Sequence, residues 1–388
     1  MGRFPKFIKA VFQYVGLFAV IILLMATSTL QGRALVKSIL FIPQVLPDIP
    51  VKPLEYVTKT PIREKILFPT LNKEKASADL YLPRGENSHP AVVFFMGVVP
   101  PDRDESRIVA LAEGLARTGM IVMIPWLETQ HQNRIVEKDI LSLVDAFIYL
   151  EKHPRVKRGK IGMGGICTGA SMSVVASQDL QINDRVSFVN SFAGYYDAVD
   201  FLVAAATKTR FDEVGATHWS PDALTRNLIT AHIVDGTFER DQVILNRILK
   251  TSKWTQQDSD DLSPSGRAVL TLISGPDVDA AREAISSLNS RTTQFLKNIS
   301  PSTNIGNLKA EVLLMHDSFD KLVPSEESRR FAKAIESNGR RVYHTEFSLF
   351  QGAVQVHMDD SKGPSTLEFL KQAGKLYTHM YNVMRLSE

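Results

Sequence analysis

The chain has 388 residues, of which 44% are hydrophobic, and its 45 basic and 42 acidic residues leave a formal net charge of +3. This length exceeds what one compact domain usually holds and predicts one large domain with an insertion. The small net charge gives no electrostatic footprint for nucleic acid, so we expect no nucleic-acid partner. The single cysteine, Cys167, excludes an internal disulfide and a zinc site built on several thiolates. No metal or other cofactor is predicted.

The first 31 residues carry a membrane signal. Three basic residues precede an apolar stretch over residues 10–26. This order is typical of a signal peptide, and the small residues 26–28 resemble its cleavage site. Residues 7–30 are also long enough to span a bilayer as an uncleaved anchor. We favour a single-pass anchor with a cytoplasmic amino end and the main domain outside the cytoplasm, and cleavage with secretion is the alternative.

Residues 32–61 form a proline-rich segment between this anchor and the main domain. Several apolar residues in it are interrupted or followed by Pro43, Pro47, Pro50 and Pro53. Because proline interrupts helices, we expect an extended connector without a long helix. Whether it rests on the membrane or packs on the domain is left open.

From residue 62, strand patterns alternate with helical patterns. Two segments predict an opening antiparallel pair, and continuous apolar runs predict strands that are covered on both faces. The predicted strands are residues 65–68, 77–82, 91–96, 121–124, 160–163, 186–189, 311–315 and 342–349. Such alternation predicts the α/β class, with a doubly wound, mostly parallel sheet and an active site at the carboxyl ends of its strands. The predicted core is residues 62–196 and 308–388.

Residues 197–307 interrupt the alternation and are too many for a simple connection. Helical signals are frequent in them, including Ser220-Pro221-Asp222 and Ser263-Pro264, which are typical of helix starts. We predict an inserted helical cap. A cap over the strand ends would shape a pocket and exclude water from it.

Cys167 stands in the string Gly165-Ile166-Cys167-Thr168-Gly169, between the strand at 160–163 and a helix predicted over 168–176. A sharp strand-to-helix turn lifts one side chain clear of the sheet and requires small residues two positions before and after it. Gly165 and Gly169 meet this requirement. The pattern therefore predicts a nucleophile elbow with sulfur in place of oxygen, whose helix amides favour the thiolate. A packed, inert cysteine is the alternative.

A thiol nucleophile needs a base and a third group that orients the base. Asp320 follows the strand at 311–315, and His357 follows the last strand. Both positions lie beyond carboxyl ends of strands, and the chain order is nucleophile, acid, base. We therefore predict Cys167, Asp320 and His357 as the catalytic residues, with Asp317 as the competing acid. His344 is predicted to lie on the surface, and the weaker pocket candidates are Trp126, His131, Tyr195, Tyr196 and His316.

The oxyanion that forms during acyl transfer needs backbone amides held in place to receive it. The amide of Thr168, directly after the nucleophile, is one predicted donor. The second should come from the loop after the strand at 91–96, where Gly97 lets the backbone turn and Val98 is the favoured donor. An ordinary loop would have the same sequence.

These motifs resemble those of the α/β-hydrolase superfamily, and the cysteine elbow most resembles that of its dienelactone hydrolase branch. The resemblance covers residues 62–196 and 308–388 and implies an eight-stranded core with a Cys-Asp-His triad. Two departures stand out: this chain has Met96-Gly97 where many relatives have His-Gly, and dienelactone hydrolases are generally compact, soluble and without such a cap. Polyhydroxyalkanoate synthases also look similar, because they use cysteine in this elbow.

The predicted function is a membrane-tethered hydrolase of a small acyl substrate, an ester, lactone or thioester, acting through an acyl-enzyme. A cysteine acyltransferase is the first alternative, since the cap could exclude water. A noncatalytic membrane-anchored binding module is the second, because the histidine before Gly97 is missing. No oligomeric state is predicted.

Overall fold

The computed structural model describes residues 28–388 except 47–48, 71–73, 133, 213–214 and 349–365. Most of the predicted anchor and His357 therefore lie outside the described residues. The main sheet has eight strands in the order β1-β2-β4-β3-β5-β6-β9-β10. Their bounds are β1 Ile62–Pro69, β2 Lys75–Leu82, β3 His89–Phe95, β4 Ile121–Trp126, β5 Val156–Ile166, β6 Val186–Phe192, β9 Glu311–Asp317 and β10 Val342–Phe347.

Only β2 runs against its neighbours, being antiparallel to both β1 and β4, and every other neighbouring pair in this sheet is parallel. This confirms the prediction of an α/β protein with a mostly parallel sheet and an opening antiparallel pair. The continuous apolar runs explain the parallel strands, because a strand covered on both faces has no polar side. In β4, for example, all six residues are buried.

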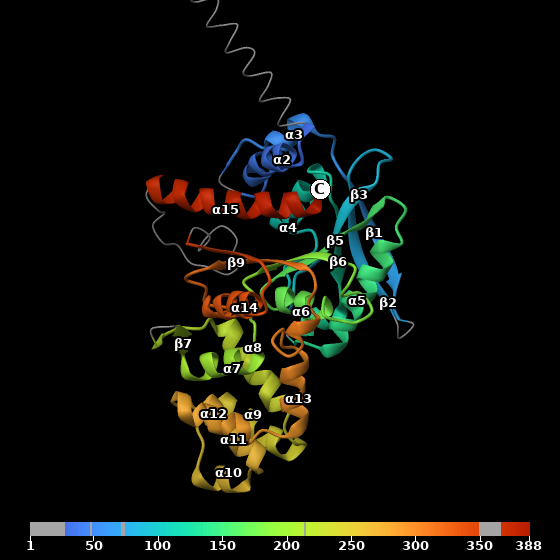
Figure 1. Ribbon diagram of the computed structural model, residues 1–388. Coiled ribbons are helices and arrows are strands. Elements are labelled where there is room, and N and C mark those ends of the chain that lie inside the picture. The colour runs from blue at the N-terminus through green and yellow to red at the C-terminus, as the bar shows by residue number, and fades with distance from the viewer. Residues whose placement is uncertain (1–27, 47–48, 71–73, 133, 213–214, 349–365) are drawn as a thin grey trace, which may run out of the picture.

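Helices cover both faces of the sheet (Figure 1). One face, which we call the α6 face, packs against α5 Glu137–Glu151, α6 Thr168–Ala176 and α14 Glu326–Ser337. Its buried side chains include Phe95 and Met163. The other face, the α15 face, packs against α4 Ser106–Arg117 and α15 Thr366–Ser387, and α2 Leu30–Val45 packs on these two helices. Phe94 and Phe188 belong to its separate apolar cluster.

The helix α2 contradicts the predicted extended connector. Its first turn is capped by Thr29, whose Oγ1 accepts a hydrogen bond from Gly32 N at 3.0 Å. Pro43 falls in the last turn, where its missing N–H removes a single backbone bond, and the next proline follows the helix end. Pro53 opens the short helix α3 Pro53–Val57, at a position that tolerates proline. Among the described residues, no helix is both long and apolar enough to cross a bilayer.

The chain between β6 and β9 forms a body of helices at the end of the molecule away from α2 and α3 (Figure 1). We call this body the cap. Asp222 and Ser263 accept first-turn amides and so begin two of its helices, as the helix-start signals predict. A hairpin of β7 Thr209–Asp212 and β8 Gly215–His218 was not predicted. The cap helices are α7 Ala198–Thr207, α8 Ala223–Asp235, α9 Glu239–Thr251, α10 Gln256–Asp261, α11 Pro264–Ile273, α12 Val278–Ser286 and α13 Ser290–Asn298.

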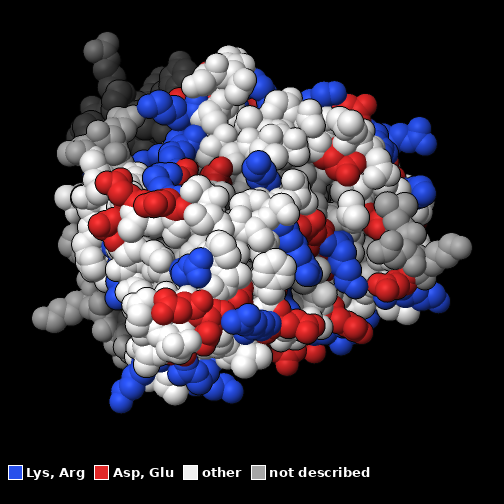
Figure 2. All heavy atoms as spheres, turned by 90° about the horizontal axis from the view of Figure 1, so that it is seen from below, with Lys and Arg blue, Asp and Glu red and all other residues white. Residues whose placement is uncertain are grey.

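The outer surface of the cap carries charges of both signs. Figure 2, which looks at the molecule from the cap end, shows basic and acidic side chains interspersed. Several are paired, such as Arg282 with Asp200 at 3.2 Å and Arg240 with Asp261 at 3.9 Å. On this face the described residues gather no large patch of one sign.

Candidate active site

Cys167 lies in a strained turn between β5 and α6. Its backbone has φ 54° and ψ −128°, a region that residues with a side chain rarely adopt. Two backbone hydrogen bonds hold the turn: Cys167 N donates to Phe192 O at 2.8 Å, and Ala170 N donates to Cys167 O at 3.0 Å. Cys167 therefore lies at the carboxyl edge of the sheet, between the end of β5 at Ile166 and the start of α6 at Thr168.

The two elbow glycines are required by close backbone approach. A Cβ on Gly165 would lie 2.5 Å from Phe95 O, and a Cβ on Gly169 would lie 2.4 Å from both Phe95 O and Gly97 N. Backbone atoms of β3 and its loop cannot move away as a flexible side chain could. The sequence signal of Gly165 and Gly169 therefore has a steric cause in the structure.

The thiol of Cys167 is not activated by the described residues. Burial, and then the negative charge of Asp320, raise its pKa to about 12, while the Thr168 amide acts in the opposite direction. The Thr168 amide favours the thiolate, as predicted for the α6 amides, but burial and the Asp320 charge outweigh its effect on the pKa. Chemistry at Cys167 near neutral pH requires a base that takes the thiol proton.

The carboxylate of Asp320 is buried in the loop after β9. Its Oδ1 accepts backbone amides from Leu322 at 2.6 Å and Val323 at 3.2 Å. Its Oδ2 lies 3.5 Å from Nε2 of the fully buried His316. Asp317, the competing acid, accepts Phe319 N at 2.9 Å and so closes its own turn. Of the two acids, Asp320 is the one whose charge acts on the thiol.

The histidines differ in their surroundings. His316 Nε2 lies 3.0 Å from Val323 O, and no partner for its Nδ1 is found among the described residues. His344 is partly buried against α14, 3.0 Å from Ser328 Oγ, so the prediction of a surface position is wrong. His131 is exposed and lines a shallow hollow beside the loop after β3.

The two predicted oxyanion donors lie side by side. Val98 N donates a hydrogen bond to Thr168 Oγ1 at 3.1 Å. In this structure a hydroxyl oxygen therefore occupies the donor that an oxyanion would use. Gly97 has φ +76°, and the β-branched Val99 also has a positive φ of 51°. If Val98 N receives an oxyanion, as predicted, its hydrogen bond to the Thr168 hydroxyl has to break first.

Gln130, which was not predicted as a site residue, holds this loop in place. Its fully buried side chain donates from Nε2 to Gly97 O at 2.7 Å and accepts Leu127 N at 2.7 Å. Its own carbonyl accepts Val99 N at 2.9 Å. These bonds hold the strained loop in place, and we know of no sequence signal that would have shown them.

The cap is bonded to the loop that carries the acid. Trp219 Nε1 donates to Asp320 O at 2.9 Å, Asp222 N donates to Lys321 O at 2.8 Å, and Thr225 Oγ1 donates to Leu322 O at 2.9 Å. On the other side of the elbow, Ile135 N donates to His232 Nε2 of α8 at 2.8 Å. The cap thus contacts loops on both sides of β5.

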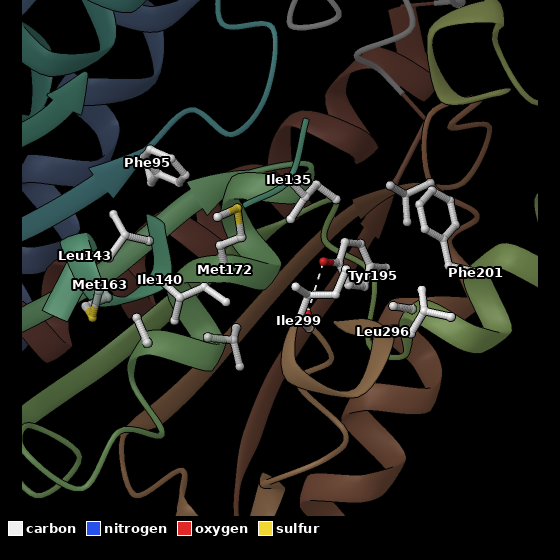
Figure 3. Packing of buried hydrophobic residues seen from close by; sticks show 14 of the residues in the cluster. Phe95, Ile135, Ile140, Leu143, Met163, Met172, Tyr195, Phe201, Leu296 and Ile299 are labelled. Atoms are coloured by element: carbon white, nitrogen blue, oxygen red, sulfur yellow. Dashed lines mark hydrogen bonds between the residues drawn. The ribbon is translucent and has the colours of Figure 1, made fainter. Parts of the chain in front are cut away.

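The aromatic pocket candidates have packing roles. Figure 3 shows Tyr195 among buried apolar side chains, with its hydroxyl donating to Ile299 O at 3.1 Å. Tyr195 also stacks on Phe201, with ring centroids 5.4 Å apart. Tyr196 stacks on Phe331 in α14.

Trp126 is buried as well and belongs to a charged network under the loop after β3. Its Nε1 donates to Asp79 Oδ2 at 3.0 Å, and Arg63 and Arg103 pair with the same carboxylate at 2.8 and 3.0 Å. Trp126 also forms part of the hollow that His131 lines.

The order of the eight strands and the sharp turn from β5 into α6 match the α/β-hydrolase fold. No family model matches the chain, and no curated protein sequence matches it significantly. Acylaminoacyl peptidase from Pyrococcus horikoshii is similar in structure, with 15% identity, a TM-score of 0.47, and 84% of this chain and 41% of that chain covered. An esterase from Pyrobaculum calidifontis has 12% identity, a TM-score of 0.46 and 92% of each chain covered. The chain spans about two fifths of the length of the acylaminoacyl peptidase structures it matches.

Proposed function

We propose that this protein is a membrane-tethered hydrolase that cleaves an ester, lactone or thioester through a cysteine acyl-enzyme, in the manner of dienelactone hydrolases. The observation that carries the proposal is the strained turn that holds Cys167 at the carboxyl edge of the sheet, close enough to Asp320 for the carboxylate to affect the thiol. Strain of this kind is kept where surrounding structure enforces it, which is common at active sites.

In the proposed mechanism, His357 takes the thiol proton of Cys167. The thiolate then attacks the substrate carbonyl carbon, a C–S bond forms, and the carbonyl electron pair moves onto oxygen. The amides of Thr168 and Val98 receive this oxyanion, after Val98 releases the Thr168 hydroxyl. Collapse expels the leaving group, which takes a proton from the imidazolium. Water deprotonated by His357 then hydrolyses the thioester, and Asp320 orients the imidazole throughout.

Hydrolysis of p-nitrophenyl acetate by the detergent-solubilised full chain tests the proposal. We expect Cys167→Ala to abolish turnover, and Asp320→Asn to lower kcat by about 10⁴-fold. Asp317→Asn is the matched control and should keep most of the activity, because Asp317 accepts Phe319 N in its own turn and Asp320 is the acid whose charge acts on the thiol. Unchanged turnover in Cys167→Ala would refute the proposal. Transfer of the acyl group to an added alcohol, with no free acid formed, would indicate an acyltransferase instead.

A noncatalytic binding module is the second candidate. Two observations favour it: burial raises the pKa of the thiol, and the Val98 amide is already bonded to Thr168. Alkylation of Cys167 with iodoacetamide across pH separates the candidates. A rate profile shifted to acid and lost in His357→Ala supports catalysis, whereas an ordinary or alkaline thiol profile in both proteins supports the module.

The membrane attachment is supported by the exposed faces of α2 and α3. Leu35 and Ile39, four residues apart on α2, are 43% and 53% exposed, and Tyr56 on α3 is 83% exposed. An apolar outer stripe is unusual for a helix that faces water. We propose that these helices face the bilayer into which the predicted anchor, residues 1–31, inserts. Retention of the full chain in membranes after an alkaline carbonate wash is the expected result, and release into the wash would contradict it.

A further inference from the structure

A cavity of about 150 Å³ lies between the α15 face of the sheet and the helices α2, α4 and α15. Its floor is formed by strands, its walls by α4 and α15, and its roof by Phe41 and Val45 of α2. A cavity of this size in an apolar core can hold a benzene molecule, a ligand of about six carbon atoms. The lining side chains are almost all apolar and include Val92, Phe94, Ile108, Leu111, Leu115, Phe188, Leu376, Met380 and Val383.

Gly164 on β5 accounts for part of this space. It lies in the floor between β3 and β6, where its missing side chain leaves the backbone as the cavity wall. A Cβ at this position would lie 2.9 Å from Asn190 O and 3.5 Å from the ring of Phe94. Because the Asn190 oxygen belongs to the backbone, a larger residue at Gly164 could not be accommodated by a rotamer change.

The cavity extends to the edge of the sheet that carries Cys167. Ile166, Phe192 and Phe347 line it, and they are the last residues of β5, β6 and β10. Parallel strands have their carboxyl ends at the same edge, and Ile166 directly precedes Cys167. The cavity therefore reaches the sheet edge at which Cys167 lies, although Cys167 itself packs against the cluster of the α6 face and does not line the cavity.

Among the described lining residues, those that carry a charge lie at this same edge. Glu105 and Arg107 lie at the start of α4 and pair with each other at 2.7 Å, and both are partly exposed to solvent. Since the two charges compensate each other, the opening favours neither anions nor cations. The lining therefore favours an apolar ligand whose shape fits the cavity.

We propose that this cavity binds the apolar end of the substrate, an aliphatic acyl chain or aromatic acyl group of about six carbons, while its carbonyl reaches Cys167. The assignment deepens the proposed function, on which it rests for the reaction at Cys167. The preferred substrates are then medium-chain or aromatic acyl esters and thioesters, which partition into membranes, and the exposed apolar residues of α2 lie beside the roof of the cavity.

Binding is tested without turnover by titrating hexanoate into the full-length Cys167→Ala protein in lipid nanodiscs, with empty nanodiscs as the blank. We expect one site per chain. Val383→Phe on α15 or Leu111→Phe on α4 should weaken binding at least tenfold by placing a ring in the cavity. Val243→Phe, on an exposed position of the cap, is the matched control and should bind as the parent does. Two variants on opposite walls protect the test if one of them unfolds.

Kinetics with p-nitrophenyl acetate, butyrate, hexanoate and octanoate give a second readout. The wild-type kcat/KM should rise to hexanoate, Val383→Phe should move the optimum to acetate, and Val243→Phe should keep the wild-type order of the four esters. Absence of hexanoate binding, or binding and chain-length preference that neither filling variant changes, would overturn the assignment. Hexanoate binding that Val383→Phe removes, without any Cys167-dependent turnover, would keep the cavity as a binding site and refute the proposed hydrolase.

Discussion

The two faces of the central sheet are packed differently, although the same strands build both. On the α6 face, β3 and α6 approach so closely that a single added carbon at Gly169 would lie 2.4 Å from backbone atoms. On the α15 face, three helices leave a cavity of about 150 Å³. The two faces therefore differ in what they can do. The α6 face fixes the position of Cys167, and the α15 face has room for a ligand.

The largest expected effect comes from adding one carbon to the dense face. Gly169→Ala places a Cβ against Phe95 O and Gly97 N, and no side chain can rotate to relieve it. We expect a loss of about 3 kcal/mol in unfolding free energy and no detectable ester hydrolysis. Thermal unfolding and p-nitrophenyl acetate turnover measure the two effects.

The same substitution at Gly374 is the control on the other side of the molecule. Gly374 lies in α15 with open space where its Cβ would be. Glycine weakens a helix, so Gly374→Ala should raise stability by about 0.5 to 1 kcal/mol. Equal effects at Gly169 and Gly374 would contradict the difference between the two faces.

A pair of neighbouring phenylalanines measures the packing directly. Phe95 and Phe94 are successive residues of β3 and point to opposite faces, with Phe95 in the α6 face and Phe94 in the cavity lining. Phe95→Ala should cost about 3 to 5 kcal/mol, and Phe94→Ala about 1 to 2 kcal/mol less, because Phe94 already borders empty space. Urea unfolding of both variants gives the difference, and equal costs would mean that the cavity is filled in the protein.

A smaller, pH-dependent effect is expected where the α6 face continues into the cap. His232 accepts Ile135 N and stacks on Phe295, and burial, then the nearby Arg134 charge, lower its pKa to about 4. A lowered folded pKa gives stability that is complete above about pH 6.5 and is lost as pH falls through 4. Between pH 7 and pH 5 the loss should be about 2 kcal/mol.

The variant His232→Gln isolates this effect. Glutamine keeps an acceptor for the Ile135 amide but does not titrate between pH 7 and pH 5. The difference in melting temperature between wild type and variant should therefore shrink or reverse as pH falls. A constant difference across this range would show that His232 does not titrate with folding.

The elements that could be predicted from the sequence are those whose signals are local. Local strand patterns located all eight strands of the main sheet, and continuous apolar runs marked buried ones such as β3. The spacing of Gly165 and Gly169 indicated the turn at Cys167, because the steric requirement falls on positions close in sequence. The starts of α8 and α11 could be predicted for the same reason, because Asp222 and Ser263 cap helices that begin at the next residue.

Other features depend on residues far apart in sequence and were missed. Proline content predicted an extended connector without a long helix in residues 32–61, but α2 forms there and packs on α4 and α15. The rise in the pKa of Cys167 was not foreseen, since the extent of burial around an elbow is a property of the whole fold. No local sequence pattern indicates the cavity, the contacts of Gln130 or the hydrogen bond of Trp219, because each joins residues far apart in the chain. The roles of Asp320, His357, Thr168 and Val98 stay predictions.

The hydrogen bond from Trp219 to the Asp320 carbonyl has a consequence for access to the site. A cap that swung aside would pull on the segment bearing the acid, and the carboxylate would leave its place at the moment a substrate arrived. If the proposed reaction takes place, we therefore expect the cap to stay in place during turnover. The cap would then hold the Asp320 loop in place, and cross-linking the cap to the core should leave the rate of the proposed reaction unchanged.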